Sequence, residues 1–351
     1  MTKEELLEKI NQGETIENVD LTGIDLSHAE LYEAIFENVI LKNANLFQAK
    51  LMEASFIKVD LSGANLSKAD LTGADLSESK LVKANLEKAI LREVNLSNTD
   101  LNEANLEGAD LSDADLSFAN LSKANLSYAK LTDADLTEAN LSYANLTNAN
   151  FTEADCEGVD FSETLLKKTV FIKTDLTRTN FSKQNLKKMV FIDADFTGAN
   201  LSQTDLSGAE LTQADFTEVN LFKANLEKIK AQSADFTRAK LISANFKDAF
   251  LKESFFEYAD LSNADFSNTN LVSAIFTQAI CKGTKFRNAD LSYADFSHAD
   301  LERADFSNAN LSWTKLHRVK EKNTIWSGAN KKTIRGTDPD LAEAEDWQPK
   351  L

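Results

Sequence analysis

The sequence predicts an all-β solenoid, and two features of a five-residue period support this fold class. Leu, Phe or Ile recurs at every fifth position from Ile16 to Leu316, except at Cys156, Ala231 and Cys281, and this period matches neither an α-helix nor a simple β-strand. A small residue, usually Ala, stands two positions before it, Asp or Asn stands directly before it, and Ser or Thr usually follows. Side chains of these polar types hydrogen-bond nearby backbone and favour turns. Each five-residue unit is therefore predicted to be a short extended piece that ends in a corner, and stacked corners make a coil.

The distribution of phenylalanine predicts how many units form one turn of the coil. Large rings pack best on other large rings in a column of the core, so residues one full turn apart should be alike. Phenylalanines at the apolar position are spaced by twenty residues in two long series: Phe196, Phe216, Phe236, Phe256, Phe276 and Phe296, and Phe246, Phe266, Phe286 and Phe306. This spacing predicts twenty residues, or four units, per turn.

The repeated motif also carries a family resemblance. The stretch ADLSDADLSFANLSKANLSYAKL at residues 109–131 repeats the unit A(D/N)LSX, and in this the chain resembles the pentapeptide-repeat proteins over residues 16 to about 320. The resemblance implies a right-handed β-helix of square cross-section with four pentapeptides per coil. At twenty residues per coil, residues 16–320 would form about fifteen coils. Members of this family include DNA-mimicking proteins that protect topoisomerases from quinolone drugs.

The ends of the chain depart from the repeat and predict a boundary on each side. Residues 1–15 are expected to form a cap helix, since Thr2 and Glu5 have the spacing of a capping box. Such a cap would cover the strand edges of the first coil. The motif fails after Leu316, so we expect a repeat domain over residues 16–320 and a C-terminal cap or tail over residues 321–351.

Charge and composition limit the partners and the compartment. The formal net charge is −18, which would repel nucleic acid and anionic membrane, so we expect neither as a direct partner. No segment has the roughly 20 apolar residues that a membrane span needs, and the charged start has no signal-peptide core. These features predict a cytoplasmic protein. Cys156 and Cys281 occupy the large apolar position and are expected to be buried and unpaired.

The sequence predicts no enzyme, no cofactor and no metal site. The three histidines are His28, His298 and His317, and no two of them are expected to lie near enough to share a metal ion. The chain has no glycine-rich phosphate loop and no nucleophile motif. The aspartates that precede the large apolar residues are expected to hydrogen-bond the backbone at the corners.

Wrapping the chain at twenty residues per turn sorts its charges by side. One column of variable positions and the neighbouring corner column are acidic, and Lys173 is the only base in these two columns before Lys315. The candidate interaction surface consists of Asp113, Asp115, Asp133, Asp135, Glu153, Asp155, Asp175, Asp193, Asp195, Asp215 and Asp235. Candidate aromatic contacts within two adjacent coils are Phe118, Tyr128 and Tyr143. An acidic side of this kind would fit a basic partner, although drift on a permissive scaffold would also explain it.

Two functions follow as hypotheses. The first is a non-catalytic, rigid scaffold or adaptor that binds one or more proteins, of unknown identity, through its acidic face. The opening stretch at residues 6–31 also resembles the lead-in to repeat domains associated with type VI secretion, which would make the partner an effector or a secretion component. The alternative is a DNA mimic that inhibits DNA gyrase or protects it from quinolones. The C-terminal end could also mediate a homodimer.

Overall fold

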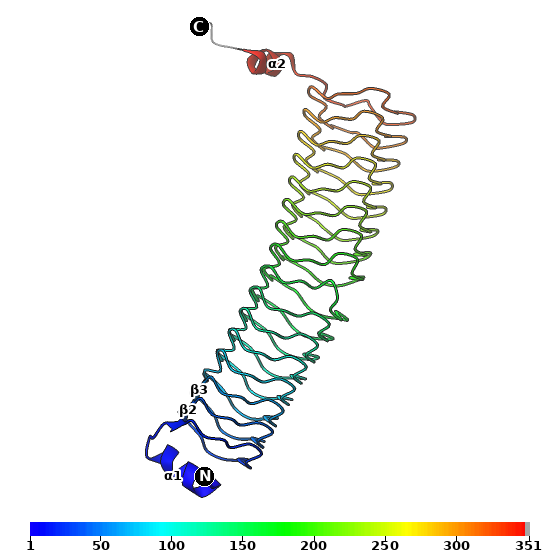
Figure 1. The fold of residues 1–351 in the computed structure, drawn as a ribbon. Helices are drawn as coiled ribbons and strands as arrows, with labels where there is room; N and C mark the ends of the chain where they lie inside the picture. The colour runs from blue at the N-terminus through cyan, green and yellow to red at the C-terminus, as the bar shows by residue number, and fades with distance from the viewer. Residues whose placement is uncertain (348–351) are drawn as a thin grey trace. The chain divides into compact units, whose positions relative to one another are not determined.

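The computed structural model describes residues 1–347, which fall into two compact units, Met1–Asn180 and a second unit that begins at Phe181. The first unit contains helix α1 (Lys3–Asn11) and the short strands β1 (Ile16–Glu17), β2 (Ile35–Glu37) and β3 (Ser55–Ile57). The second unit contains helix α2 (Pro339–Asp346). In both units the remaining chain consists largely of repeated turns and single-residue β-bridges, and Figure 1 shows the successive turns of the backbone stacked on one another within each unit.

The stacking confirms a period of twenty residues. Strands β1, β2 and β3 form a parallel sheet in which Ile16 pairs with Phe36 and Phe36 with Phe56. Beyond β3, isolated parallel bridges join corner residues to those twenty positions later, from Asp60 with Lys80 in the first unit to Lys315 with Arg335 in the second. Each unit is therefore a parallel β-helix with four five-residue units per turn.

One representative unit, residues 121–125, explains why the motif has its polar residues. Each of its five backbone N–H groups donates one hydrogen bond, so no donor is left unpaired. The pairs are Leu121 N to Asn140 O, Ser122 N to Asn120 Oδ1, Lys123 N to Ser142 O, Ala124 N to Leu121 O, and Asn125 N to Ala104 O. The Asn120 side chain also accepts from the Ser122 hydroxyl at 2.7 Å. The Asp/Asn and Ser/Thr positions thus satisfy backbone and side-chain donors that the coil itself leaves open, as the sequence predicts.

Nearly every unit turns through a residue with a positive φ angle. Lys123 has a φ of 58° and is the third residue of a four-residue turn closed by the Ala124 N–H and the Leu121 carbonyl oxygen, which are 3.0 Å apart. This is the arrangement of a type II turn, which favours glycine at that position. Most units hold another residue there, and its N–H bonds to the next coil, as Lys123 N does to Ser142 O at 2.8 Å.

Large and small side chains of the repeat fill a narrow core in each unit. In the second unit the rings of Phe216 and Phe236 are stacked with centroids 4.8 Å apart and an interplanar angle of 3°. The same parallel stacking joins Phe196 to Phe216 and continues through Phe256, Phe276 and Phe296. The predicted column is confirmed. Cys156 and Cys281 are buried and unpaired, as expected.

The two ends are closed differently. Helix α1 begins with the predicted capping box between Thr2 and Glu5, and its Leu6 is fully buried. In contrast, α2 has no buried residue. The bridges of the coil continue to Arg335, so coil geometry extends past the point at which the apolar pattern fails in the sequence.

Candidate binding surfaces

In the first unit, the predicted acidic residues form two adjacent columns. The corner column is a parallel series of bridges that joins Asp115, Asp135, Asp155 and Asp175. The variable-position column contains Asp113, Asp133 and Glu153 and ends at Lys173, whose Nζ lies 2.9 Å from Glu153 Oε1. The variable-position side chains are exposed and the corner side chains are half-buried. We call these seven acidic residues the acidic columns of the first unit.

The corner carboxylates have a structural role besides their charge. Oδ1 of Asp115 accepts the N–H of Ser117 at 2.9 Å, and Oδ1 of Asp135 accepts the N–H of Thr137 at 2.8 Å. Asp155 and Asp175 make equivalent bonds. Each carboxylate therefore holds its own turn, and its second oxygen contributes to the charge of the surface.

Stacking of like charges disfavours the ionised form of Asp155. Burial raises the pKa of its carboxyl group, and the negative charges of Asp175 and Asp135 raise it further. Another corner column of the same unit avoids this repulsion, because the Nδ2 group of Asn125 donates to Asn105 Oδ1 and that of Asn145 donates to Asn125 Oδ1, both at 3.1 Å. The acidic column thus carries an electrostatic cost that amide side chains would remove.

In the second unit the acidic series is shorter. Asp195, Asp215 and Asp235 stack in the corner column, but Phe255 and Ile275 follow them. Asp193 begins the variable-position column, which continues with neutral residues at the next two turns. The predicted acidic residues of this unit are therefore brought together only near its first turns.

The three candidate aromatic residues are exposed but do not form one patch. Phe118, Tyr128 and Tyr143 have exposed fractions of 59%, 60% and 61%. With twenty residues per turn, Phe118 and Tyr128 lie half a turn apart, on opposite sides of the coil, and Tyr143 belongs to a third column. The Tyr143 hydroxyl hydrogen-bonds Glu163, which raises its pKa. Each ring is a separate exposed side chain, so the cluster expected from sequence is absent.

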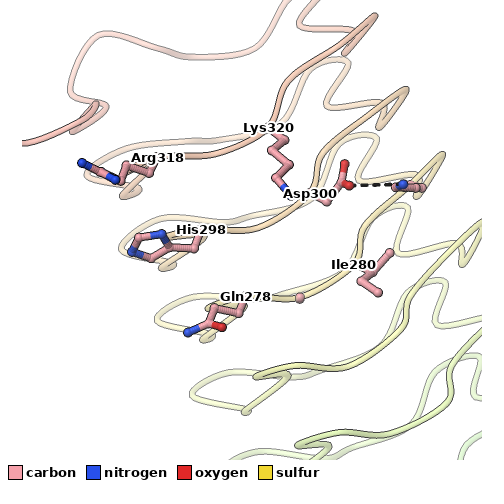
Figure 2. A pocket seen from close by; sticks show the side chains of 8 residues that line it. Gln278, Ile280, His298, Asp300, Arg318 and Lys320 are labelled. Carbon is pink, nitrogen blue, oxygen red and sulfur yellow. Dashed lines mark ion pairs between the residues drawn. The ribbon is translucent and has the colours of Figure 1, made fainter. Parts of the chain in front are cut away.

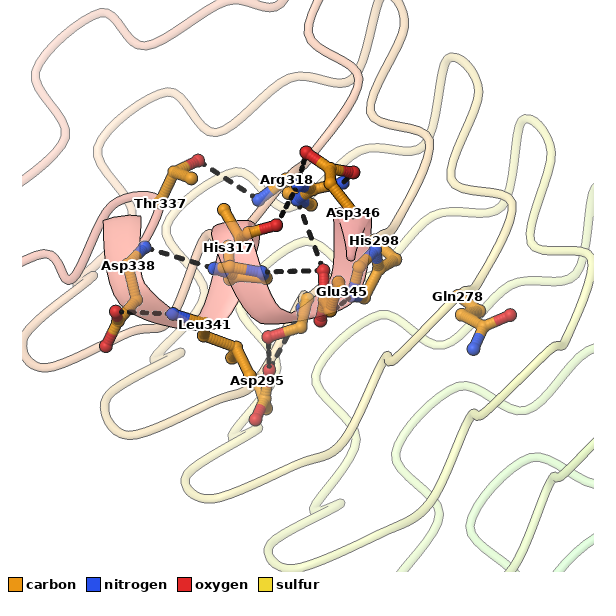
Figure 3. A network of polar contacts seen from close by, with 12 residues as sticks. Gln278, Asp295, His298, His317, Arg318, Thr337, Asp338, Leu341, Glu345 and Asp346 are labelled. Carbon is orange, nitrogen blue, oxygen red and sulfur yellow. Dashed lines mark hydrogen bonds and ion pairs between the residues drawn. The ribbon is translucent and has the colours of Figure 1, made fainter. Parts of the chain in front are cut away.

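A polar cluster at the end of the second unit was missed from sequence. His298 and His317 have ring centroids 5.3 Å apart, and Glu345 of α2 lies between them (Figure 3). Its Oε1 atom lies 3.2 Å from Nε2 of His298, and its Oε2 atom lies 3.2 Å from Nε2 of His317. The prediction that no two histidines lie near enough to share a metal ion is wrong. The two residues are one position short of a full turn apart, so twenty-residue wrapping of the sequence could have shown that they belong to adjacent coils.

This cluster has the donor types of a zinc site, but its hydrogen bonds fasten α2 to the coil. We call His298, His317, Arg318 and Glu345 the clasp. One ring nitrogen of each histidine and a carboxylate oxygen of Glu345 lie within 4.8 Å of one another, and zinc binds such groups. However, the N–H of Asp338 donates to His317 Nδ1 at 3.1 Å. The proton of a neutral His317 ring must therefore sit on Nε2, where it points at Glu345. Histidines that bind metal usually donate from their other ring nitrogen, so the geometry favours a hydrogen-bonded clasp.

The clasp holds α2 against the coil through Arg318 as well. Arg318 Nε lies 3.2 Å from Glu345 Oε2, and Nη1 donates to Asp346 Oδ1 at 2.8 Å. Its backbone N–H donates to Thr337 Oγ1 at 3.2 Å. Partial burial opposes the ionisation of Glu345, but the hydrogen bonds from His317 and His298 prevail and lower its pKa. The bond to Arg318 lowers the pKa of Asp346.

A shallow hollow of about 520 Å³ lies beside the clasp. Figure 2 shows Gln278, His298 and Arg318 on successive turns along one border of it. Asp300 lies on the other border, where its carboxylate is 3.3 Å from Lys282 Nζ. Most of the residues that line the hollow are polar or charged, which suits a polar ligand.

The sequence matches the family model described as Pentapeptide repeats (8 copies) in adjoining and overlapping segments between residues 16 and 320. Among solved structures, HetL, a pentapeptide repeat protein from the cyanobacterium Nostoc sp. strain PCC 7120, is similar at 27% identity and a TM-score of 0.51. The match covers 62% of this chain and 89% of HetL. These matches establish a right-handed β-helix as the fold.

Two other solved structures are similar over parts of the sequence but superpose poorly. A pentapeptide repeat protein of the Arabidopsis thaliana thylakoid lumen is 31% identical, with coverage of 30% of this chain and 63% of that one and a TM-score of 0.13. Full-length QnrB1, a plasmid-mediated fluoroquinolone resistance protein, is 16% identical, with coverage of 83% and 96% and a TM-score of 0.14. No curated protein matches the sequence. Neither helix of the described chain could span a membrane.

Proposed function

Because this chain belongs to the pentapeptide-repeat family, we propose that it is a non-catalytic protein-binding scaffold whose acidic columns dock a basic segment of a partner protein. The full repeat would comprise about fifteen coils of square cross-section over residues 16–320. The observation that carries the proposal is the stack of Asp115, Asp135, Asp155 and Asp175 in the first unit. These four carboxylates are in register, and burial and the neighbouring charges raise the pKa of Asp155. A cationic partner would stabilise such a surface.

Two further observations support binding over catalysis. The corner carboxylates of the first unit bond the backbone of their own turns, which gives them a structural role rather than a catalytic one. HetL, the relative with the same fold at 27% identity, is described as involved in the regulation of heterocyst differentiation. A regulatory role of that kind fits a protein that acts by binding.

The proposal is tested by comparing two charge-reversal variants as baits. Asp113→Lys with Asp133→Lys alters exposed positions of the acidic columns, whereas Glu78→Lys with Glu138→Lys makes the same change in net charge at exposed positions in a different column. Quantitative mass spectrometry of cross-linked complexes from the native host should find a partner with a basic segment that the first variant loses and the second retains. Equal recovery with both variants would refute the docking role.

The same acidic columns favour one alternative, a DNA mimic that inhibits gyrase or protects it from quinolones. Stacked carboxylates resemble the regular negative charge of a duplex. Against this role, lysines occupy variable positions in other columns, such as Lys83 and Lys123, whereas a duplex is anionic on all sides. A gyrase supercoiling assay, with and without a quinolone, decides the matter. Wild-type protein that changes neither reaction at micromolar concentration is no mimic of this target.

Three finer assignments belong to the same proposal. The first is a cytoplasmic location, which fits the net charge of −18, and the second is an association with type VI secretion, which rests on the resemblance of residues 6–31. A homodimer through the C-terminal end would cover the half-buried apolar side chains of the last coil, among them Leu316 and Trp326. Fractionation of the host cell and light scattering of the purified protein would test location and oligomeric state.

A further inference from the structure

Charge at the C-terminal end of the second unit is sorted in a way that differs from the rest of this acidic chain. Residues 315–335, which we call the terminal basic coil, contain seven basic residues, Lys315, Arg318, Lys320, Lys322, Lys331, Lys332 and Arg335, and one acidic residue, Glu321. The segment 338–346, which comprises α2 and its N-cap, contains five acidic residues and no basic one. An acidic helix is therefore seated on a basic coil.

The contacts between them recognise both the side chains and the backbone of the helix. Nη2 of Arg318 donates to the carbonyl oxygen of Ala342 at 2.6 Å, while Nη1 of the same side chain binds Asp346. His298 and His317 both contact the Glu345 carboxylate (Figure 3). A guanidinium that bonds a helix carbonyl and a carboxylate one turn later fits an acidic helix better than it fits a phosphate chain.

The attachment of α2 lacks the apolar burial that would make it permanent. Leu341 and Trp347 have exposed fractions of 49% and 72%, whereas Leu6 of α1 is fully buried against the first coil. A helix of this length is marginal in water without a buried face, and exposed ion pairs stabilise weakly. The helix can therefore leave the coil at low cost.

We propose that the surface formed by His298, His317 and Arg318 binds an acidic helical segment of a partner protein, and that α2 occupies this surface until the partner displaces it. The proposal is independent of the acidic columns, because it concerns another surface with the opposite charge. Lys320, whose side chain is exposed at the border of the neighbouring hollow, would extend the same cationic surface. The terminal basic coil would then give the scaffold a second, covered docking site.

The test measures binding of an acidic helix supplied in trans to the full-length chain. The probe is a fluorescein-labelled peptide of residues 337–347, and the release variant is Glu345→Ala with Asp346→Ala. The matched control is Asp340→Ala with Glu343→Ala, which removes two charges from the same helix but keeps the ion pairs of Glu345 and Asp346 with Arg318. Fluorescence polarisation should show that the release variant binds the peptide about tenfold more tightly than wild type or control, since a tethered helix competes at an effective concentration near millimolar.

Three results would overturn the proposal. The first is equal affinity of the release variant and wild type for the peptide, and the second is unchanged affinity after Arg318→Ala is added to the release variant. The third is tighter binding of a DNA duplex than of the peptide by the release variant at the same ionic strength, which would identify a phosphate-binding surface. A dimer that exchanges α2 between copies, detected by light scattering, would replace the partner protein by a second copy of this chain. The peptide assay is separate from the bait experiment, so a failure of the acidic-column proposal would not change its result.

Discussion

Replacing Asp155 by asparagine is expected to stabilise the first unit. The carboxylate lies between Asp135 and Asp175 in the corner column, and burial together with these two charges raises its pKa. An asparagine would keep the Oδ1 atom that accepts the N–H of Glu157 at 2.9 Å. Its Nδ2 group could also donate to the carboxylate one coil earlier, as Asn120 does to Asp100 at 2.9 Å. The substitution therefore removes a repulsion and adds a hydrogen bond.

The size of the effect follows from the spacing of the coils. At about 4.8 Å between neighbouring strands, two unit charges repel by about 0.9 kcal/mol at the dielectric constant of water. Salt reduces this repulsion for half-exposed groups, and a new hydrogen bond contributes about 0.5–1.5 kcal/mol. We expect a net gain of about 1–2 kcal/mol in the free energy of unfolding at pH 7 and low salt.

Urea unfolding of the full-length chain, monitored by circular dichroism, measures this gain. The matched control is Asp100→Asn, which lies between Lys80 and Asn120 rather than between carboxylates and should not stabilise. Because the folded-state pKa of Asp155 is raised, its ionised form destabilises the fold, and this cost disappears as pH falls through that pKa. The advantage of asparagine should therefore shrink in acid. Equal stability of wild type and Asp155→Asn at pH 7 would refute the argument from stacked charge.

Three further outcomes are expected. Phe236→Ala should cost about 3–5 kcal/mol through its cavity, visible as a lower midpoint of urea unfolding, and a cost below about 1 kcal/mol would contradict a packed ring column. Because the pKa values of Glu345 and Asp346 are lowered in the folded state, their contribution to docking of α2 is present above their unfolded pKa values and is lost as pH falls through the folded ones. Trp347 fluorescence should therefore change in acid below about pH 4, and an identical change in Glu345→Ala with Asp346→Ala would count against it. Chelation by EDTA should leave the Trp347 signal unchanged, because the His317 clasp needs no metal, whereas a shift that added zinc restores would establish a metal site.

Much of the fold could be predicted from the sequence because each coil repeats the same local chemistry. The spacing of Phe216 and Phe236 revealed the length of a turn, since a ring column requires its members to be in register. The capping box of Thr2 and Glu5 was readable for a similar reason, because its hydrogen bonds join residues close in sequence. The acidic columns were found by grouping positions that are twenty residues apart.

The clasp could not be predicted in the same way because it depends on where the chain goes after the repeat ends. Wrapping could have placed His298 beside His317, but the position of Glu345 depends on how the segment after Arg335 leaves the last coil. The aromatic candidates were not brought together in one patch because their columns were not compared. Phe118 and Tyr128 were grouped by closeness along the chain, whereas a coil of twenty residues places them on opposite sides.

The central claim, that the acidic columns dock a basic partner, is tested most directly by association kinetics. The partner captured by the wild-type bait should be purified and its association rate constant measured by surface plasmon resonance at low and physiological ionic strength. Complementary charge acts mainly on the rate of encounter, so Asp113→Lys with Asp133→Lys should slow association at low salt by about tenfold or more and leave little salt dependence. Glu78→Lys with Glu138→Lys should associate at nearly the wild-type rate. Equal association rates for the two variants, with the same dependence on salt, would contradict the claim.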